Sequence, residues 1–320
     1  MSVALSNTGT AGQSVLDHAK DNRYQVVTNA SELDAIAEAN ADKPVLGLFS
    51  EGNMPRVLNQ SIPTTDGGDL QPATCVANPE FTEETPRLGA MTSKALELLR
   101  NDNGFLLQVE SASPDKADHQ ADACGLIGEV GQLDEAVQAV QKWVEETGEE
   151  TLIVATADHA HTAQITYDNA NTAGRVTQLT TVDGSTMAVN FATSKTNEDE
   201  DALGGQQHTG AQLRVAASGP GAANVTGQID QTDLFFLVNN ALGIESINHG
   251  LTFDTTMTPV EAQPEGNSEG NSEGSAQGSS ITSPLLIAVL SISGIIGLLS
   301  LIALLFPFPV DEVLGPIAKR

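Results

Sequence analysis

The sequence predicts an α/β fold in which helices cover both faces of a largely parallel sheet. Short apolar runs of strand length alternate with amphipathic helical segments, the pattern of a doubly wound layer architecture. The run at 152–157 is continuously apolar, as in buried parallel strands. Acidic and imidazole side chains follow the runs at 105–110 and 152–157, and α/β folds bind ligands beyond the carboxyl ends of such strands.

The first half of the chain yields five regular elements and one long excursion. Residues 51–83 are rich in Pro, Gly, Asn and Thr, which favours an extended path over a helix or strand. A capping-box-like Ser31-Glu-Leu-Asp34 indicates a helix start. The expected elements are a helix at 14–21, a strand at 23–28, a helix from 31 to about 40, a strand at 44–49 and a helix at 91–99.

The second half continues the alternation of strand and helix. Asp183-Gly184 within alternating polar and β-branched residues predicts a hairpin over 166–187. Residues 197–205 are acidic and are expected to form a flexible loop. The remaining elements are strands at 105–110, 152–157 and 213–217, and helices at 133–146 and 231–241.

The C-terminal residues predict a tethered membrane protein. Residues 256–283 repeat Glu-Gly-Asn-Ser and are typical of a disordered linker after a domain at 1–255. Residues 285–306 are uncharged and long enough to cross a bilayer as a helix, so we expect a span over 284–306. The basic ending of 307–320 favours a cytoplasmic tail, with the domain outside the cytoplasm, at the cell surface or in the periplasm.

The charge balance narrows the choice of partners. Only 14 Lys and Arg accompany 42 Asp and Glu, for a formal charge of −28. Because phosphate neutralisation needs cations, nucleic acid is excluded as a partner. A saline habitat and an ordinary acidic secreted enzyme both fit the composition. The N-terminus has no basic and apolar signal-peptide pattern.

Carboxylate and imidazole groups gather in three stretches. Asp115 and His119 are four residues apart, which places both on one helix face, and a distant His208 gives a third ligand. Three such ligands with an open fourth position are typical of catalytic zinc. Asp158-His159, with His161, follow a buried strand directly.

Two further features bear on the site. Glu110, at another strand end, suits a hard ion such as magnesium. Cys75 and Cys124 are the chain's two cysteines and are either one disulfide or two unrelated thiols. A bridge would stabilise the fold by roughly 4 kcal/mol and indicate an oxidising compartment.

Four stretches resemble the C-terminal half of bacterial alkaline phosphatases over roughly residues 10–245. They are PVLGLFSEGNMP, FLLQVESASPDKADH, TADHAHTAQI and QHTGAQLRVAASGPGAANVTGQIDQTDLFFLVNNAL. The resemblance implies a three-layer α/β/α sheet, of which this chain holds part, and a phosphate monoesterase with two Zn²⁺ and one Mg²⁺. It also implies a disulfide between Cys75 and Cys124.

The resemblance assigns a role to each matched residue. Asp115, His119 and His208 correspond to ligands of the first zinc, and Asp158 and His159 to ligands of the second. Glu110 corresponds to a magnesium ligand. His161 corresponds to a supporting histidine, and Lys116 to a residue near the phosphate or an ordinary surface lysine.

One part of the family pattern does not occur in these residues. The family's serine nucleophile follows an aspartate, and the 320 residues contain no Asp-Ser dipeptide. We therefore expect a C-terminal portion that is inactive alone. The alternatives are a surface protein that binds metal or phosphate without turnover, and one half of a split phosphatase that assembles with a complementing N-terminal fragment. The resemblance also implies a homodimer.

Overall fold

The computed structural model describes residues 14–194, 205–243 and, as one strand, 286–292. The predicted linker at 256–283, the tail at 307–320 and nearly all of the acidic loop at 197–205 lie outside these residues.

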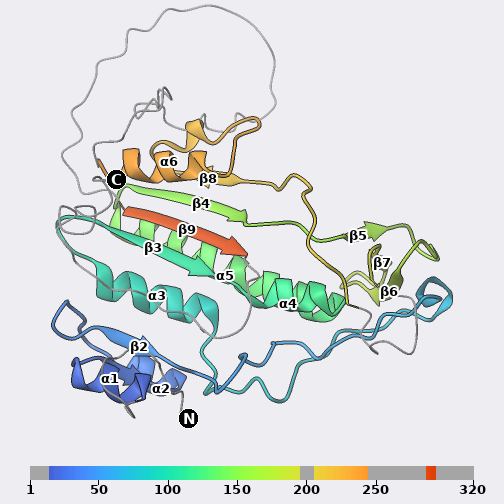
Figure 1. Ribbon diagram of the computed structural model, residues 1–320, viewed down its shortest axis with the longest axis horizontal. Coiled ribbons are helices and arrows are strands. Elements are labelled where there is room, and N and C mark those ends of the chain that lie inside the picture. Colours follow the sequence, from blue (N-terminus) through green and yellow to red (C-terminus); the bar gives the residue numbers. More distant parts are fainter. Residues whose placement is uncertain (1–13, 195–204, 244–285, 293–320) are drawn as a thin grey trace, which may run out of the picture.

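A four-stranded sheet forms the centre of the molecule (Figure 1). Strands β3 (Phe105–Glu110), β9 (Leu286–Ile292) and β4 (Thr151–Ala157) run parallel, and β8 (Ala216–Ser218) is antiparallel to β4. The order is β3-β9-β4-β8. Because β3 and β4 are parallel, their carboxyl ends lie at the same edge of the sheet.

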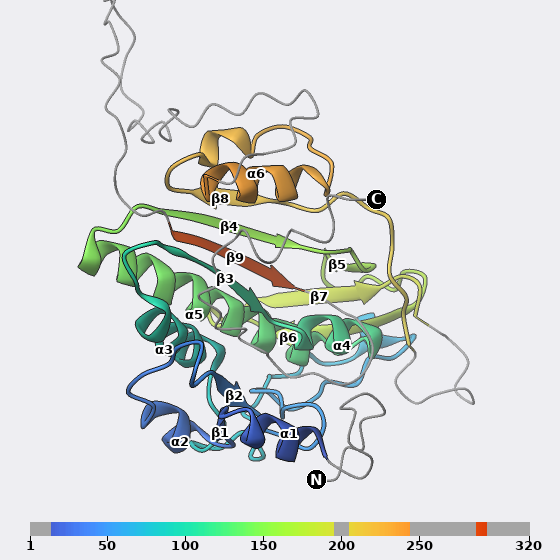
Figure 2. The same ribbon diagram turned by 60° about the vertical axis from the view of Figure 1, so that its left-hand side comes forward.

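Helices cover both faces of this sheet, as the sequence predicts (Figure 2). Helices α3 (Leu88–Leu99) and α5 (Ala123–Thr147) pack on one face around Leu96, Val109 and Val140. Helix α6 (Asp233–Ala241) and the short 3₁₀ helix η2 (Ala222–Asn224) cover β4 from the other face. The side chains of β4 alternate between the two cores, since Ile153 joins the first and Leu152 and Val154 join the second.

The N-terminal strands form a separate two-stranded sheet, packed against α3 at Leu98 and Leu99, rather than a continuation of the main sheet. Strands β1 (Gln25–Val27) and β2 (Val45–Gly47) pair in parallel, next to α1 (Val15–Asp21) and α2 (Ala30–Asp34). The predicted helix from Ser31 to about 40 is wrong at both ends. Asn29 caps the helix by accepting from Glu32 N, and the Glu32 carboxylate accepts from Thr28 N, so the reciprocal capping pattern begins two residues earlier.

The predicted hairpin is confirmed at its Asp183-Gly184 turn, but it runs over 175–191 rather than 166–187. Strands β6 (Arg175–Thr180) and β7 (Thr186–Phe191) pair antiparallel across a turn in which Gly184 has φ 84°. Strand β5 (Ala163–Thr166), not predicted, adds to the free side of β7. The 3₁₀ helix η1 (Gly67–Asp69) lies in the long segment between β2 and α3. This segment contacts β6 through a bridge between Thr64 and Val176.

Helix α5 begins ten residues before its predicted start at 133. Asp122 caps it by accepting from Gly125 N. Glycine has low helix propensity, so the glycines of the first turns concealed the helix. Gly128 is needed there, because a Cβ would lie 2.8 Å from a Val57 methyl group. The predicted disulfide is present between Cys75 and Cys124, in the first turn of α5.

The predicted membrane helix at 284–306 is wrong for residues 286–292, which form strand β9. Residues 286–292 are Leu, Ile, Ala and Val with one Ser, and such a run fits a buried parallel strand as well as a helix, because it has no charged face in either period. Residues 293–306 lie outside the described part. None of the helices in the described ranges combines the length and hydropathy needed to cross a bilayer.

Candidate metal centre

The site is assembled at the carboxyl ends of β3 and β4. After β3 the chain enters α4 (Ser113–His119), a short helix with Pro114 in its first turn. Asp115 and His119 are one turn apart on α4 and therefore face the same side. Asp158, His159 and His161 follow β4 directly. The segment after residue 205 crosses this edge and brings His208 to the same place.

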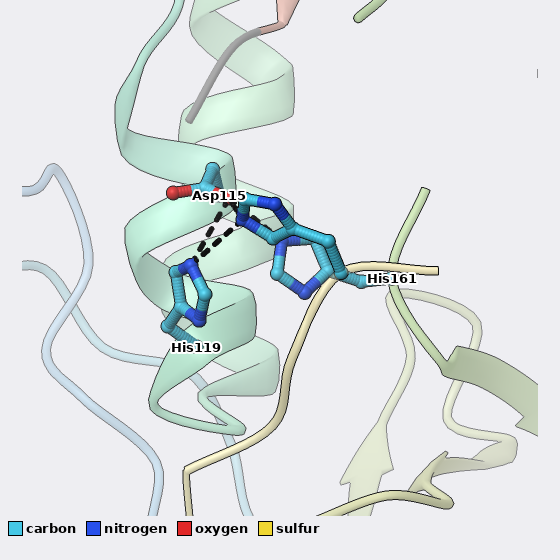
Figure 3. A group of neighbouring side chains, drawn as sticks. Asp115, His119 and His161 are labelled. Atoms are coloured by element: carbon cyan, nitrogen blue, oxygen red, sulfur yellow. Dashed lines mark hydrogen bonds and ion pairs between the residues drawn. The ribbon is translucent and has the colours of Figure 1, made fainter. Parts of the chain in front are cut away.

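Four side chains converge on one point, and Figure 3 labels three of them, Asp115, His119 and His161. Asp115, His119, His161 and His208 each offer a ligand atom, and these atoms lie within 4.8 Å of one another. Asp115 Oδ1 is 2.7 Å from His161 Nε2, 3.1 Å from His208 Nε2 and 3.5 Å from His119 Nε2. His208 Nε2 is 2.9 Å from His119 Nε2.

Asp158 and His159, the residues predicted to bind a second zinc, lie at the margin of this group. His159 Nε2 is 3.6 Å from Asp115 Oδ1 and 3.6 Å from Asp158 Oδ2. The rings of His159 and His208 stack with centroids 3.5 Å apart. Glu110 ends β3, and Lys116 lies between the ligands of α4; both are half-buried and outside the four-residue group.

The electrostatics of the group suit a cation. Burial raises the pKa of Asp115, but the His161 hydrogen bond and the surrounding imidazoles outweigh it, so the net pKa is lowered and the carboxylate is charged. Desolvation, and then His159, lower the pKa of His208 and keep its ring neutral. A charged carboxylate and neutral imidazoles are the forms that bind metal.

Unpartnered buried atoms test whether a metal fits. Asp158 Oδ1, both ring nitrogens of His159 and His161 Nδ1 are buried without a hydrogen-bond partner within the described part of the chain. Buried polar atoms normally have partners. Carboxylate and imidazole are also zinc donors, so the residues present fit zinc.

Two residues that the sequence analysis did not single out support the group. Asp118 is buried, and burial raises its pKa to about 6. Gln206 is fully buried and donates from Nε2 to Asp118 Oδ1 at 3.0 Å. In the sequence, Gln206 stands out only by lying two residues before His208.

Comparisons with known proteins find similar sequences over most of the chain. A family model described as alkaline phosphatase matches residues 4–244. The alkaline phosphatase of Escherichia fergusonii is 46% identical over 247 residues, which are 75% of this chain and 51% of that protein. Alkaline phosphatase H of Pseudomonas aeruginosa is 48% identical over 236 residues, 73% of this chain and 48% of that protein.

A solved structure is also similar. The alkaline phosphatase from the Antarctic bacterium TAB5 matches with a TM-score of 0.45 and 18% sequence identity, covering 73% of this chain and 56% of that chain. The chain thus spans about half the length of the curated relatives that it matches.

Proposed function

This chain belongs to the alkaline phosphatase family, and from that premise we propose that it carries the zinc-binding part of a phosphate monoester hydrolase. The convergence of Asp115, His119 and His208 supports the proposal most directly. A carboxylate and two imidazoles supply three ligands of a tetrahedral zinc and leave the fourth position to water or substrate, as in catalytic sites.

The remaining predicted ligands complete the proposal. Asp158 and His159 would hold a second zinc, which accounts for their buried atoms without partners. Glu110 would hold magnesium at the end of β3, and Lys116 would lie near the phosphate. His161 would support the first zinc ligand set by donating from Nε2 to Asp115 Oδ1.

The residues divide the chemistry as follows. Bound metal would act as a Lewis acid on the phosphoryl oxygen and the leaving oxygen. It would also supply a hydroxide nucleophile near neutral pH. The His161 bond fixes the Asp115 carboxylate, so that one oxygen faces His119 and His208. The lowered pKa of His208 favours its neutral ring, the form of imidazole that binds metal.

We propose that turnover requires a serine from outside these 320 residues. The family's Asp-Ser nucleophile does not occur in them, and the chain spans about half the length of its relatives. Purified chain with zinc and magnesium should hydrolyse a chromogenic phosphate monoester no faster than free metal does. Turnover that His208→Ala abolishes would contradict this proposal.

Assembly with a complementing chain is a second candidate, which the edge of the main sheet favours. Among the described strands, β3 has a neighbour on one side only, and Leu106 on it is 45% exposed. An edge strand with an exposed apolar side chain can accept a further strand. Adding the N-terminal half of a family member should then restore hydrolysis in this chain but not in its His208→Ala variant.

The proposed location is outside the cytoplasm, and the disulfide supports it because such bonds persist in oxidising compartments. Membrane attachment through residues 293–306, which follow β9, is a separate proposal. The full chain should float with lipid vesicles, and a variant lacking residues 293–306, which keeps β9, should not. Equal flotation of the two chains would end this part of the proposal.

Zinc binding tests the centre of the proposal. By calorimetry, Asp115→Asn should weaken zinc binding by more than the ~10–100-fold that loss of an outer partner costs, because Asp115 contacts every histidine of the group. His18→Ala is the matched control, since His18 is exposed on α1, away from the group. Equal affinity in the two variants would refute the proposed site.

A further inference from the structure

Gln206 is a fully buried polar residue whose backbone and side-chain polar groups all have partners. Its side chain donates from Nε2 to Asp118 Oδ1 at 3.0 Å and accepts at Oε1 from the Thr162 hydroxyl. Its backbone N–H donates to His119 O at 3.1 Å, and its carbonyl lies 2.8 Å from His119 Nδ1. One residue thus joins α4, the loop after β4 and the segment that carries His208.

The carbonyl contact decides where the proton of His119 lies. A carbonyl oxygen can only accept, so Nδ1 of the neutral ring carries the hydrogen. Nε2 is then an unprotonated lone pair, directed toward His208 Nε2 at 2.9 Å and Asp115 Oδ1 at 3.5 Å. This is the tautomer in which His119 can bind a metal at that point.

The His208 segment is held on the other side of the histidine as well. Thr209 N donates to Ala160 O at 2.7 Å, and the Thr209 hydroxyl donates to His161 O at 3.3 Å. His208 therefore sits between two anchors, one on α4 through Gln206 and one on the loop after β4. Only the anchor at Gln206 also contacts a ligand ring.

We propose that Gln206 is the positioning residue of this centre. Its buried amide ties Asp118 to Thr162, and this tie holds its carbonyl on His119 Nδ1 and sets the spacing of His119 and His208. The inference rests on the proposed function for its metal, whereas the tautomer that it assigns to His119 is a property of the metal-free chain.

A second buried glutamine provides a matched control. Gln178 on β6 is 5% exposed, donates from Nε2 to the carbonyls of Gly68 and Leu70 at 2.8 Å each, and accepts at Oε1 from Asn169 N. Like Gln206 it is buried and its side-chain amide is hydrogen-bonded at both ends, but none of its partners is a residue of the centre. Replacing either glutamine with leucine leaves buried polar groups without partners.

The two leucine variants separate positioning from general stability. Both Gln206→Leu and Gln178→Leu should lower the urea midpoint of the metal-free chain. Only Gln206→Leu should weaken binding of Co²⁺ by tenfold or more and change the visible absorption of the cobalt complex, which reports ligand geometry. Equal cobalt affinity and equal spectra in both variants would overturn the proposal.

A paired exchange tests the hydrogen bond itself. Gln206→Glu alone places a carboxylate against that of Asp118 and should weaken cobalt binding. Adding Asp118→Asn restores the hydrogen bond in the reverse direction, because the new amide at position 118 can donate to the new carboxylate at position 206. The double variant has the same net charge as the native chain. Cobalt affinity should return to within about threefold of the native value, and failure of this rescue would contradict the role of the side chain.

The tautomer of His119 provides a readout that needs no metal. In ¹⁵N spectra of the metal-free chain at alkaline pH, His119 should carry its proton on Nδ1, and in Gln206→Leu it should exchange between tautomers. A fixed Nδ1 proton in both proteins would overturn the role of Gln206. A native chain that shows this tautomer but binds no cobalt would instead refute the proposed metal function alone.

Discussion

Glu129 on α5 is a buried carboxylate outside the metal centre. It accepts from Val57 N at 2.9 Å and from Gln132 Nε2 at 3.2 Å, with Arg56 nearby. Burial nevertheless dominates and raises the pKa of Glu129. The folded chain therefore binds this proton more tightly than the unfolded chain does. The associated stability is full below the ordinary carboxyl pKa and is lost as the pH rises through the raised one.

Glu129→Gln should remove this dependence, because the amide is neutral at every pH and its oxygen can still accept from Val57 N. In urea unfolding of metal-free protein, the variant should gain stability relative to the native chain as the pH rises through the raised pKa of Glu129. Glu145→Gln, at an exposed position of the same helix, is the control for the loss of one charge. A gain that does not change with pH would contradict the prediction.

The sequence singles out the candidate ligand residues one by one, whereas it does not single out the residues that support them. Asp115 and His119 show a helical spacing, and Asp158 and His159 follow an apolar run, so local pattern alone locates them. Gln206 has no such signal, because its role comes from burial and from partners 44 and 88 residues away. Contacts of that separation depend on the tertiary fold.

Among the elements, α4 and the first turn of α5 connect the centre to the disulfide. Asp122 accepts from Arg56 at 2.7 Å and from Ser61 N at 2.8 Å, and Cys124 bridges to Cys75 across 49 residues. The long segment between β2 and α3 is thereby attached to the N-terminus of α5. Its apolar support consists of few side chains, among them Leu58 and Leu179.

Replacing both cysteines with serine should therefore destabilise the chain by about 4 kcal/mol, the loop-closure value for a bridge of this length. Urea unfolding with and without a thiol reductant measures it. Reductant should lower the native midpoint to that of the variant and leave the variant unchanged. A variant as stable as the oxidised native chain would show that local packing alone holds the long segment between β2 and α3.

The sequence predicts the bounds of an element correctly where its local pattern is unambiguous. Strand β3, for example, matches its predicted range of 105–110. The predicted bounds fail where a local signal conflicts with packing. The glycines at the start of α5 reduce helix propensity, yet one of them, Gly128, allows Val57 and Leu58 to approach closely. Helix α2 ends at Asp34, and Lys94 of α3 donates from Nζ to the Asp34 carbonyl at its last residue.

At the scale of the whole molecule, the apolar run near the C-terminus shows the limit of periodicity. Strand β9 lies between β3 and β4, the two strands that lead to the metal centre. A run without charged residues fits the centre of a parallel sheet and the interior of a bilayer equally, since both environments are apolar on every side. Sequence alone identifies such a run but does not decide whether it packs in a sheet or in a bilayer.

The charge of the whole molecule sets its response to salt. With 42 acidic and 14 basic side chains, repulsion between carboxylates exceeds what ion pairs can offset, and exposed pairs such as Arg23–Asp42 contribute only ~0–1 kcal/mol each. The Debye length falls from about 10 Å at 0.1 M salt to about 3 Å at 1 M. Added salt should therefore screen more repulsion than attraction and stabilise the folded chain.

The urea midpoint of the metal-free chain should rise with sodium chloride, most steeply at low ionic strength. Sodium perchlorate at equal ionic strength is the control, because screening depends on ionic strength whereas anion-specific effects differ between the two salts. A rise common to both salts below about 0.2 M, where screening changes fastest, identifies electrostatic repulsion as the cause. A midpoint that falls with salt would mean that attractive pairs, rather than the excess of carboxylates, control the electrostatic free energy of this fold.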